Sequence, residues 1–510
     1  MNSYDEMPYP AGVYPQTDPS RISAIAKLLG VEFVIPDNSN VLELGCANGL
    51  NLTSLASIYP EAKFTGVDSS DRQIQQGNRR IEALGLTNIC LLTLSIEDVT
   101  ESLGEFDYIL VHGVYSWVPE ETRSCIFKIC ENQLSQNGLA YISYNVLPGW
   151  NSAKSVRDMM LFHSKNFEKP LEKVLEARRM LGFIRENVQG ESHYSQMLKE
   201  EVDRLVNVPD AYLFHDHLEG INDPCYFSDF ADQLSSHNLQ YVSDSSLGDQ
   251  YLGNYSEKAK ETLKALNDTV QAEQYLDFLA NRRFKRSIIC KSGKQISRNI
   301  SPDRMEGLEF TSNVKERTAS TDNNVHFESV NGTIVKTSSS VIEASLRILE
   351  STGQNALTLG EISRRVAVET DNISQDVVAP ELKTAFVQLV LQGVVSVRLA
   401  RSNAVSSQAQ HLPCVLPLAM KVSEENNTVP NLYNTPVQLD IATQSLLKFF
   451  DGTKSKDELV EIYIDLCLDG TLTCQEDGKT VKEKGRLIEL LPRSLETILS
   501  GLNDNALLVR

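Results

Sequence analysis

The residues best suited to chemistry form a glycine-containing turn after an apolar run. The sequence reads Val41-Leu42-Glu43-Leu44-Gly45-Cys46-Ala47-Asn48-Gly49, an E-x-G-x-x-x-G pattern. The glycines allow a tight turn and close backbone approach, and a helix beginning after them would offer free N–H groups to a carboxylate. The spacing matches neither the dinucleotide-binding G-x-G-x-x-G nor a P-loop. It predicts a loop for the methionine end of S-adenosylmethionine (SAM), formed by Glu43, Gly45, Cys46, Ala47 and Gly49.

Three further features follow in chain order. The run Lys63–Val67 ends in Asp68 and Ser69, where a carboxylate can accept hydrogen bonds from two ribose hydroxyls. Ile96 and Glu97 follow the next apolar run, which predicts an apolar contact with adenine and an acidic group near its amine. His112 and Gly113 end the fourth run, where ligands of open α/β sheets bind. A single glycine is more often a turn and a single Asp a helix cap, but four features in order favour a SAM site over a degenerate nucleotide-binding fold.

The elements that must position these residues alternate along the chain. Between Val41 and Asn145 the apolar runs VLEL, KFTGVD, ICLLTL, FDYILVHG and AYISYN are separated by amphipathic stretches. Such alternation is typical of an α/β fold with a parallel sheet covered by helices on both faces. We therefore predict a Rossmann-like class I methyltransferase domain.

The 510-residue length predicts several folding units. We expect a SAM-binding domain with an N-terminal lid over residues 1–150 and a mainly helical middle domain over 151–295, closed by a strand at Phe284–Cys290. Residues 296–337 are expected to form a linker with a small hairpin at Asn331-Gly332. Helical periodicity followed by a strand predicts a winged-helix-like module over 338–402, and a second helical module, of possible winged-helix form, over 403–510.

Net charge, cysteine arrangement and hydrophobicity indicate which partners and which cellular compartment to expect. The formal net charge of −20 disfavours a nucleic-acid backbone, although many soluble proteins are acidic for colloidal reasons alone. The nine cysteines lack a paired C-x-x-C arrangement, and no run approaches 18 apolar residues. We expect a cytoplasmic chain without membrane insertion or disulfides. The helix expected at Glu381–Leu389 carries one lysine, so we expect the C-terminal modules to bind protein or to form a homodimer.

Several motifs resemble one bacterial family. They are Tyr4-Asp5-Glu6-Met7-Pro8-Tyr9-Pro10, the segment from His112 to Val118, Ser143-Tyr144-Asn145 with Pro148-Gly149-Trp150, and Asn222-Asp223-Pro224. From Tyr4 to about Cys290 the chain resembles methyltransferases that carry a methyltransferase regulatory domain, among them the rickettsial protein-lysine methyltransferases. The resemblance implies SAM as methyl donor and a protein substrate that presents lysines. The chain departs from the family's Tyr-Asn-Thr-Tyr-Pro-Gly-Trp, because Val146 and Leu147 replace the Thr and the second Tyr.

Aromatic residues near these motifs are candidates for the acceptor channel. We expect Tyr115, Trp117, Tyr144 and Trp150 to line it, because aromatic faces can hold a cationic ammonium, and Asn145 or His112 to orient the acceptor or the cofactor. The alternative for the two tryptophans is packing at a domain junction. Tyr4, Tyr9 and Tyr14 are interpreted as a lid over the cofactor, or otherwise as a frayed terminus.

A metal is not expected. Methyl transfer is an in-line displacement that needs alignment more than a Lewis acid. His215-Asp216-His217 with Cys225 resembles a ligand set, but residues i and i+2 do not share a helix face. Three functions remain open: methylation of protein lysines, methylation of a small metabolite or surface-glycan precursor, and non-catalytic binding of SAM as a signal.

Overall fold

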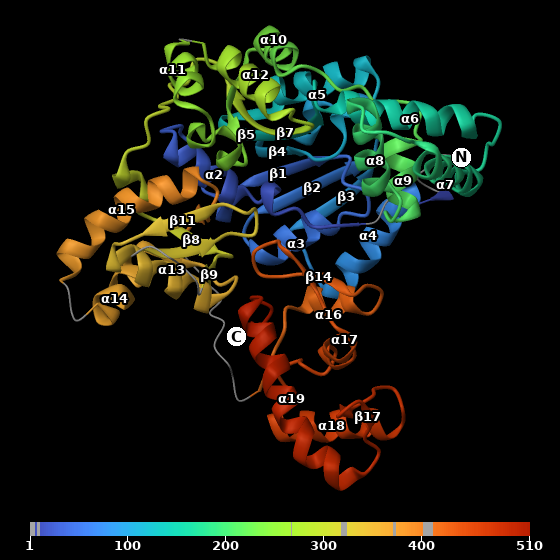
Figure 1. The fold of residues 1–510 in the computed structure, drawn as a ribbon, viewed down its shortest axis with the longest axis vertical. Helices are drawn as coiled ribbons and strands as arrows, with labels where there is room; N and C mark the ends of the chain where they lie inside the picture. Colours follow the sequence, from blue (N-terminus) through green and yellow to red (C-terminus); the bar gives the residue numbers. More distant parts are fainter. Residues whose placement is uncertain are drawn as a thin grey trace.

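A seven-stranded sheet forms the centre of the computed structural model, which describes residues 6–7, 11–266, 268–317, 324–370, 374–400 and 412–509. The strand order is β3-β2-β1-β4-β5-β7-β6 (Figure 1). The strands are β1 (Asn40–Leu44), β2 (Lys63–Asp68), β3 (Ile89–Thr93), β4 (Phe106–Val111), β5 (Leu134–Asn145), β6 (Leu239–Asp244) and β7 (Phe284–Lys291). β1 to β5 pair in parallel, whereas β7 runs antiparallel to both β5 and β6. The predicted Rossmann-like fold is confirmed.

Helices cover both faces of the sheet, as the continuous apolar strands predicted. Along β1 and β4 the buried side chains alternate between two cores: Val41 and Tyr108 face one, Leu42 and Ile109 the other. The first face is covered by α2 (Pro19–Leu28), α3 (Leu50–Ile58) and α4 (Asp71–Leu84), and the second by α5 (Glu120–Gln133) and α10 (Phe227–Ser236). α11 (Glu257–Ala265) and α12 (Thr269–Ala280) extend the layer beside α10.

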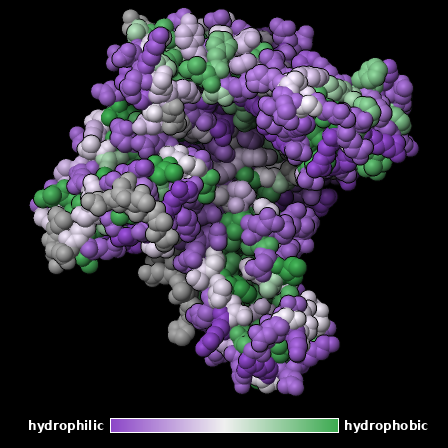
Figure 2. Space-filling view, in the orientation of Figure 1, coloured by the Kyte–Doolittle hydropathy of each residue, from purple (hydrophilic) through white to green (hydrophobic). Residues whose placement is uncertain are grey.

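The sheet does not end where we expected the first domain to end. β6 and β7 come from the range 151–295 that was expected to form a separate helical domain. Six residue pairs join β7 to β5, from Ala140–Ile289 to Asn145–Phe284, so the boundary at residue 150 is wrong for the sheet. A helical lobe with its own core does follow β5, formed by α6 (Trp150–Ser164), α7 (Pro170–Asn187), α8 (His193–Leu205) and α9 (Asp210–His217). Figure 2 shows a largely hydrophilic face that is hollowed where this lobe faces the centre of the molecule.

The expected linker over 296–337 is mostly ordered structure, which corrects that interpretation. β8 (Leu308–Ser312) pairs with β13 (Val395–Leu399) and β12 (Leu357–Thr358). The sequence around β8 looked polar and aperiodic, but Met305, Leu308 and Phe310 are fully buried. β9 (Lys315–Arg317), β10 (Val325–Glu328) and β11 (Ile334–Thr337) form an antiparallel sheet, and the hairpin at Asn331-Gly332 joins β10 to β11 as predicted. β8, β12 and β13 pack with α13 (Ser340–Thr352), α14 (Leu359–Glu369) and α15 (Gln375–Leu391) into one unit. We name it the first winged-helix-like unit after the module expected in this range.

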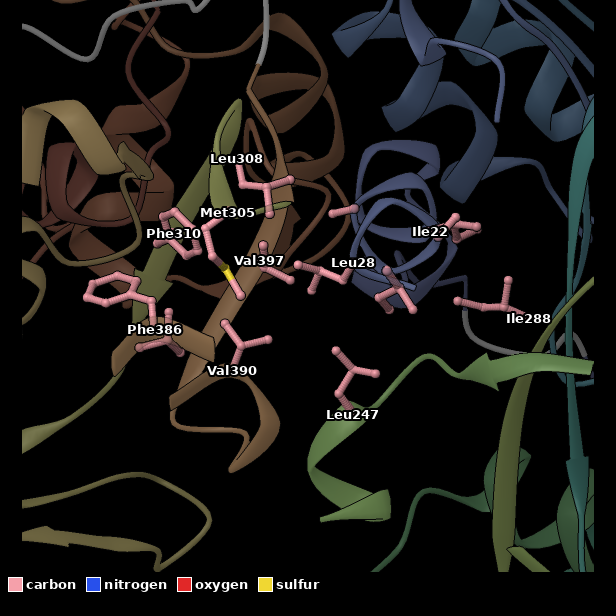
Figure 3. Close-up of a cluster of buried hydrophobic side chains, with 14 of the residues drawn as sticks. Ile22, Leu28, Leu247, Ile288, Met305, Leu308, Phe310, Phe386, Val390 and Val397 are labelled. Carbon is pink, nitrogen blue, oxygen red and sulfur yellow. The ribbon is translucent and has the colours of Figure 1, made fainter. Parts of the chain in front are cut away.

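Helix α2 joins this unit to the methyltransferase sheet. Eight of its residues are buried, so it packs on both sides, unlike a surface helix with one apolar stripe. Figure 3 shows Ile22 on the side of the sheet residue Ile288, and Leu28 facing Val397 of β13. The two units therefore share one continuous core.

The C-terminal unit has a separate core. It contains α16 (Pro417–Ser423), α17 (Ile441–Leu447), α18 (Lys456–Leu468), α19 (Lys484–Asp504), β14 (Thr428–Pro430), β15 (Pro436–Gln438), β16 (Gln475–Glu476) and β17 (Lys479–Thr480). Val13 and Leu50 belong to this core although they come from the N-terminal part of the chain. The unit therefore docks beside α3, below the sheet in Figure 1. Within the described ranges, no helix is long and apolar enough to cross a membrane.

Candidate active site

A cavity of about 400 Å³ lies at the carboxyl ends of β1, β2 and β4. This is where open α/β sheets bind their ligands. The expected cofactor residues that line it are Glu43, Gly45, Cys46, Ala47, Asp68, Ser69, Ile96, Glu97, His112 and Gly113. Gly49 does not line it, and Tyr9 lies outside the described residues. Four separate segments thus converge on one site in the predicted order.

Asp68 ties the first two of these segments together. Its Oδ2 accepts the backbone N–H of Ala47 at 2.8 Å, and its Oδ1 accepts the N–H of Ser70 at 2.9 Å. The first loop turns sharply, with positive φ at Gly45 (71°) and Ala47 (51°). A Cβ on Gly45 would lie 2.5 Å from the Val114 side chain, so glycine is needed there for space as well as for conformation. The carboxylate therefore shapes the loop in addition to facing the cavity.

Gly49 has a packing role and does not line the cavity. It is the N-cap of α3, with φ of 65°, and a Cβ there would lie 2.5 Å from the Leu91 side chain on β3. The two glycines of the motif are therefore needed for two different structural reasons. Gly45 opens the cavity, and Gly49 lets α3 begin close to the sheet.

Glu43 holds an unsatisfied buried oxygen at the wall of the cavity. Its side chain is 3% exposed, and Oε1 accepts a hydrogen bond from Asn51 Nδ2 at 3.0 Å. Among the described residues, Oε2 has no hydrogen-bond partner. Burial raises the pKa of this carboxyl to about 8, against the smaller lowering effect of the Asn51 hydrogen bond. An ammonium group, such as that of the methionine end of SAM, would satisfy the open oxygen, so the site fits the predicted cofactor.

The rings of His112 and Tyr14 lie against each other, tilted by 30°, on another wall of the cavity. Their ring centroids are 3.8 Å apart, and Nδ1 of His112 shares a hydrogen bond with the Tyr141 hydroxyl at 3.0 Å. Burial lowers the pKa of His112 to about 4 and raises that of Tyr14 to about 12, so both are neutral near pH 7. Tyr14 therefore lies where the lid was expected, whereas Tyr4 lies outside the described residues.

Of the five expected acceptor residues, only Trp117 lines the cavity. Tyr115 and Tyr144 are each 1% exposed and pack against Phe230 of α10, Tyr144 in a stack with centroids 4.1 Å apart. They belong to the second core of the sheet, so their assignment to the acceptor channel is corrected. Their hydroxyls bond inside the protein, to Gln233 and Ser287 respectively.

The remaining two expected residues lie behind Trp117. Trp150 meets Trp117 edge to face at 6.4 Å and stacks on His217 at 6.1 Å. Asn145 is 3% exposed, and its side-chain amide donates to Asn222 Oδ1 at 3.4 Å. Neither lines the cavity, so each can act on an acceptor only through its neighbours.

The sequence interpretation missed part of the lining. Asn51, in the first turn of α3, links Glu43 to the N-terminal segment. Thr122 of α5 donates to Glu97 and is the main cause of the lowered pKa of that carboxyl. His215 and Asp216 reach the cavity from α9; the pair had drawn attention only as a rejected metal motif. Only the position of Asn51, two residues after the glycine motif, offered a sequence signal.

Comparisons with known proteins agree with this geometry. Family models match residues 35–202 ("Methyltransferase domain"), 209–291 ("Predicted methyltransferase regulatory domain") and 412–507 ("PKMT, C-terminal winged helix domain"). An uncharacterised protein of Rickettsia prowazekii is 36% identical over 100% of this chain and 94% of its own length. PKMT2 from Rickettsia typhi, solved with AdoHcy, superimposes with a TM-score of 0.89 at 30% identity, covering 99% of this chain and 100% of that one.

The chain belongs to the rickettsial PKMT family of methyltransferases. It is a SAM-dependent methyltransferase, since AdoHcy is the product that SAM leaves after donating its methyl group. Membership also confirms winged-helix character for the C-terminal unit, which the sequence had suggested only by its order of elements. A further relative from Synechocystis is 28% identical over 56% of this PKMT-family chain and 57% of its own length.

Proposed function

We propose that this methyltransferase modifies lysine side chains of a protein substrate. The observation that carries the proposal is the acidic cavity wall, which includes the carboxyl groups of Asp68, Glu97 and Asp216. Glu43 adds a fourth carboxyl, whose raised pKa of about 8 keeps it protonated at neutral pH until a cation binds. Among the described residues, no lysine or arginine lines this cavity. Such a wall attracts a cationic side chain and repels a phosphate or carboxylate acceptor. The resemblance to rickettsial protein-lysine methyltransferases supports the same class of substrate.

The chain's own residues would bind and orient the cofactor. We assign Asp68 to the ribose hydroxyls, Ile96 to the adenine face and Glu43 to the ammonium, because all three line the cavity. SAM, when bound, supplies a methyl group on a sulfonium, which a neutral amine can attack. Tyr14 and His112 exclude water from one wall, and alignment of the amine within about 3 to 3.5 Å is the main requirement for transfer.

The acceptor lysine must lose its proton before transfer. A free lysine has a pKa of about 10.4, and burial between aromatic walls lowers it. Trp117 offers an indole face in the cavity, with Trp150 fixing its orientation from behind. Asp216 lies on the same cavity and is the group that we assign to attract the incoming ammonium and receive its proton. His112 is neutral near pH 7 and adds no opposing charge.

We also propose that the protein acts in the cytoplasm and as a homodimer. The nine scattered cysteines suit a reducing compartment, which supports a cytoplasmic site of action. A homodimer is proposed as the functional unit. Cell fractionation and light scattering of the purified chain test these two points.

Transfer of labelled methyl groups from SAM to bacterial cell extracts tests the substrate class. We expect label in protein bands, and acid hydrolysis should release it as methyl-lysine. Asp68→Ala should abolish labelling, whereas Glu101→Gln, an exposed carboxyl outside the cofactor cavity, should leave it unchanged. Label confined to low-mass compounds would overturn the proposal in favour of a metabolite or glycan precursor. Label on another amino acid would overturn the assignment to lysine.

A further inference from the structure

A second cavity, of about 330 Å³, lies between the methyltransferase sheet and the first winged-helix-like unit. Its walls come from four places: α2, the loop after β6, the β10–β11 turn, and the segment from α15 to β13. Leu247, Val390 and Val397 form its apolar side and are seen together in Figure 3. The cavity therefore exists only where the two units meet, and it shares no lining residue with the cofactor cavity.

Arg21 of α2 brings a positive charge to this cavity. Its Nε is buried without a hydrogen-bond partner, and within the described chain no carboxylate forms an ion pair with its guanidinium. Burial and the nearby Arg398 and Arg286 lower the pKa of Arg21 to about 10 and outweigh the raising effect of the Asp18 carboxylate, so Arg21 stays protonated at neutral pH. A partly buried guanidinium whose Nε lacks a hydrogen-bond partner is costly, which indicates that a group outside the chain completes its hydrogen bonds.

The neighbouring charges are already engaged. Arg398 lies 3.7 Å from Asp18 and stacks over the Tyr433 ring at 4.2 Å. Arg286 pairs with Asp249 at 3.1 Å.

Asp249 also lines the cavity, and Arg282 pairs with it at 3.1 Å as well. Two arginines therefore neutralise the carboxylate that would otherwise repel an anion. Asp18, the carboxylate that acts on Arg21, is paired with Arg398, so Arg21 has no ion-pair partner of its own among the described residues.

Neutral groups that can donate hydrogen bonds surround the free charge. The side chains of Ser245, Ser246, Thr333 and Ser396 line the cavity, and Ser245 Oγ is buried without a hydrogen-bond partner among the described residues. A guanidinium group and several hydroxyl groups can donate hydrogen bonds to the same oxyanion, because an oxyanion accepts hydrogen bonds on more than one oxygen.

We propose that this interdomain cavity binds a small oxyanion, held by Arg21 and the surrounding hydroxyls. The ligand is a compound that carries a phosphate or carboxylate group, and its site is separate from that of the cofactor. The inference does not depend on the identity of the methyl acceptor. Because both units supply the walls, an anion bound here stabilises their association by the free energy of binding.

Calorimetric titration of the full-length chain with inorganic phosphate tests the site. S-adenosylhomocysteine is kept saturating, so that the cofactor cavity is filled, and sodium chloride holds the ionic strength constant. We expect saturable binding and a rise in melting temperature that chloride alone does not produce. A parallel titration with citrate distinguishes a phosphate-bearing ligand from a carboxylate-bearing one.

Two variants address the cavity and one serves as control. Arg21→Gln should weaken phosphate binding at least tenfold. Ser396→Glu keeps Arg21 and places a carboxylate on an exposed strand position beside it, so it should abolish binding without loss of the fold. Arg79→Gln removes an exposed charge that does not line the cavity and should bind as the wild type does. Absence of saturable binding of either anion to the wild type, or equal binding by Ser396→Glu, would overturn the proposal.

Discussion

The side-chain amide of Asn434 donates to Asn51 Oδ1 at 3.0 Å and so joins the C-terminal winged-helix unit to the wall of the cofactor cavity. The same amide donates to the carbonyl of Tyr14 at 3.1 Å. Asn51 in turn donates to Glu43 at 3.0 Å. A residue near the end of the chain thus positions the groups that face the cofactor.

Removal of this amide should weaken cofactor binding. Asn434 has a φ of 53°, so Asn434→Gly deletes the side chain without straining the backbone. The substitution removes both hydrogen bonds of the amide, each worth about 0.5–1.5 kcal/mol. Because only the bond to Asn51 leads on to Glu43, we expect a two- to tenfold higher Kd for S-adenosylhomocysteine by calorimetry. Asn426→Gly, an exposed position in the same unit, should leave the Kd unchanged. Equal affinity in the two variants would mean that the winged-helix unit does not position the site.

Loss of the Asp68 carboxylate should have a larger effect. Asp68→Ala removes the expected ribose contacts and also frees the N–H groups of Ala47 and Ser70. Hydrogen bonds to charged groups are worth about 1.5–3 kcal/mol, so cofactor affinity should fall by at least tenfold. Calorimetry measures the affinity, and thermal unfolding shows whether the chain remains folded. A folded Asp68→Ala variant with wild-type affinity would contradict the assignment.

Local sequence patterns were enough to predict which residues line much of the cofactor cavity, and the reason is physical. Glu43 and Asp68 lie at the carboxyl ends of β1 and β2, and Ile96 and His112 come after β3 and β4. Parallel strands deliver their carboxyl ends to one edge of the sheet. The order of strands along the chain was therefore sufficient to bring these residues together. No pairing between distant segments had to be known.

Features that depend on long-range packing could not be predicted in this way. Asn434 and Asn51 are 383 residues apart, and nothing local marks either as a partner of the other. β7 inserts antiparallel between β5 and β6 after a long helical segment, so its membership of the sheet was hidden. Tyr144 lies on a strand whose residues alternate between two buried faces, and sequence alone does not show which tyrosine meets the cavity.

Trp117 and Tyr115, two residues apart, should respond differently to substitution. Trp117→Ala removes an aromatic wall of the cavity, so we expect methyl transfer to fall at least tenfold, mainly through a higher KM for the protein acceptor. Tyr115→Phe removes only the hydrogen bond to Gln233 and should cost about 1 kcal/mol of stability with little effect on transfer. Steady-state kinetics and denaturant unfolding on both variants check this. A transfer defect in Tyr115→Phe would restore its channel role.

The raised pKa of Glu43 predicts a pH-dependent affinity for the cofactor. In the free protein this carboxyl, with a pKa of about 8, is protonated at pH 6. A bound ammonium favours the carboxylate, so binding should release a proton, and the Kd should fall by up to about tenfold per pH unit between pH 6 and 8. His112, with a pKa of about 4, and Tyr14, with a pKa of about 12, do not titrate in this window. Calorimetry in buffers of different ionisation enthalpy measures the proton release.

The raised pKa of Glu43 also determines how the stability of the fold changes with pH. Between about pH 4.5 and 8 the unfolded chain has released this proton and the folded chain retains it, so the Glu43 contribution to stability falls as pH rises. Glu43→Gln should flatten both the affinity and the stability profiles. Glu101→Gln, at an exposed carboxyl outside the cavity, should retain the slope of the affinity profile. A slope of the affinity profile that persists unchanged in Glu43→Gln would contradict the assignment of the titration to Glu43.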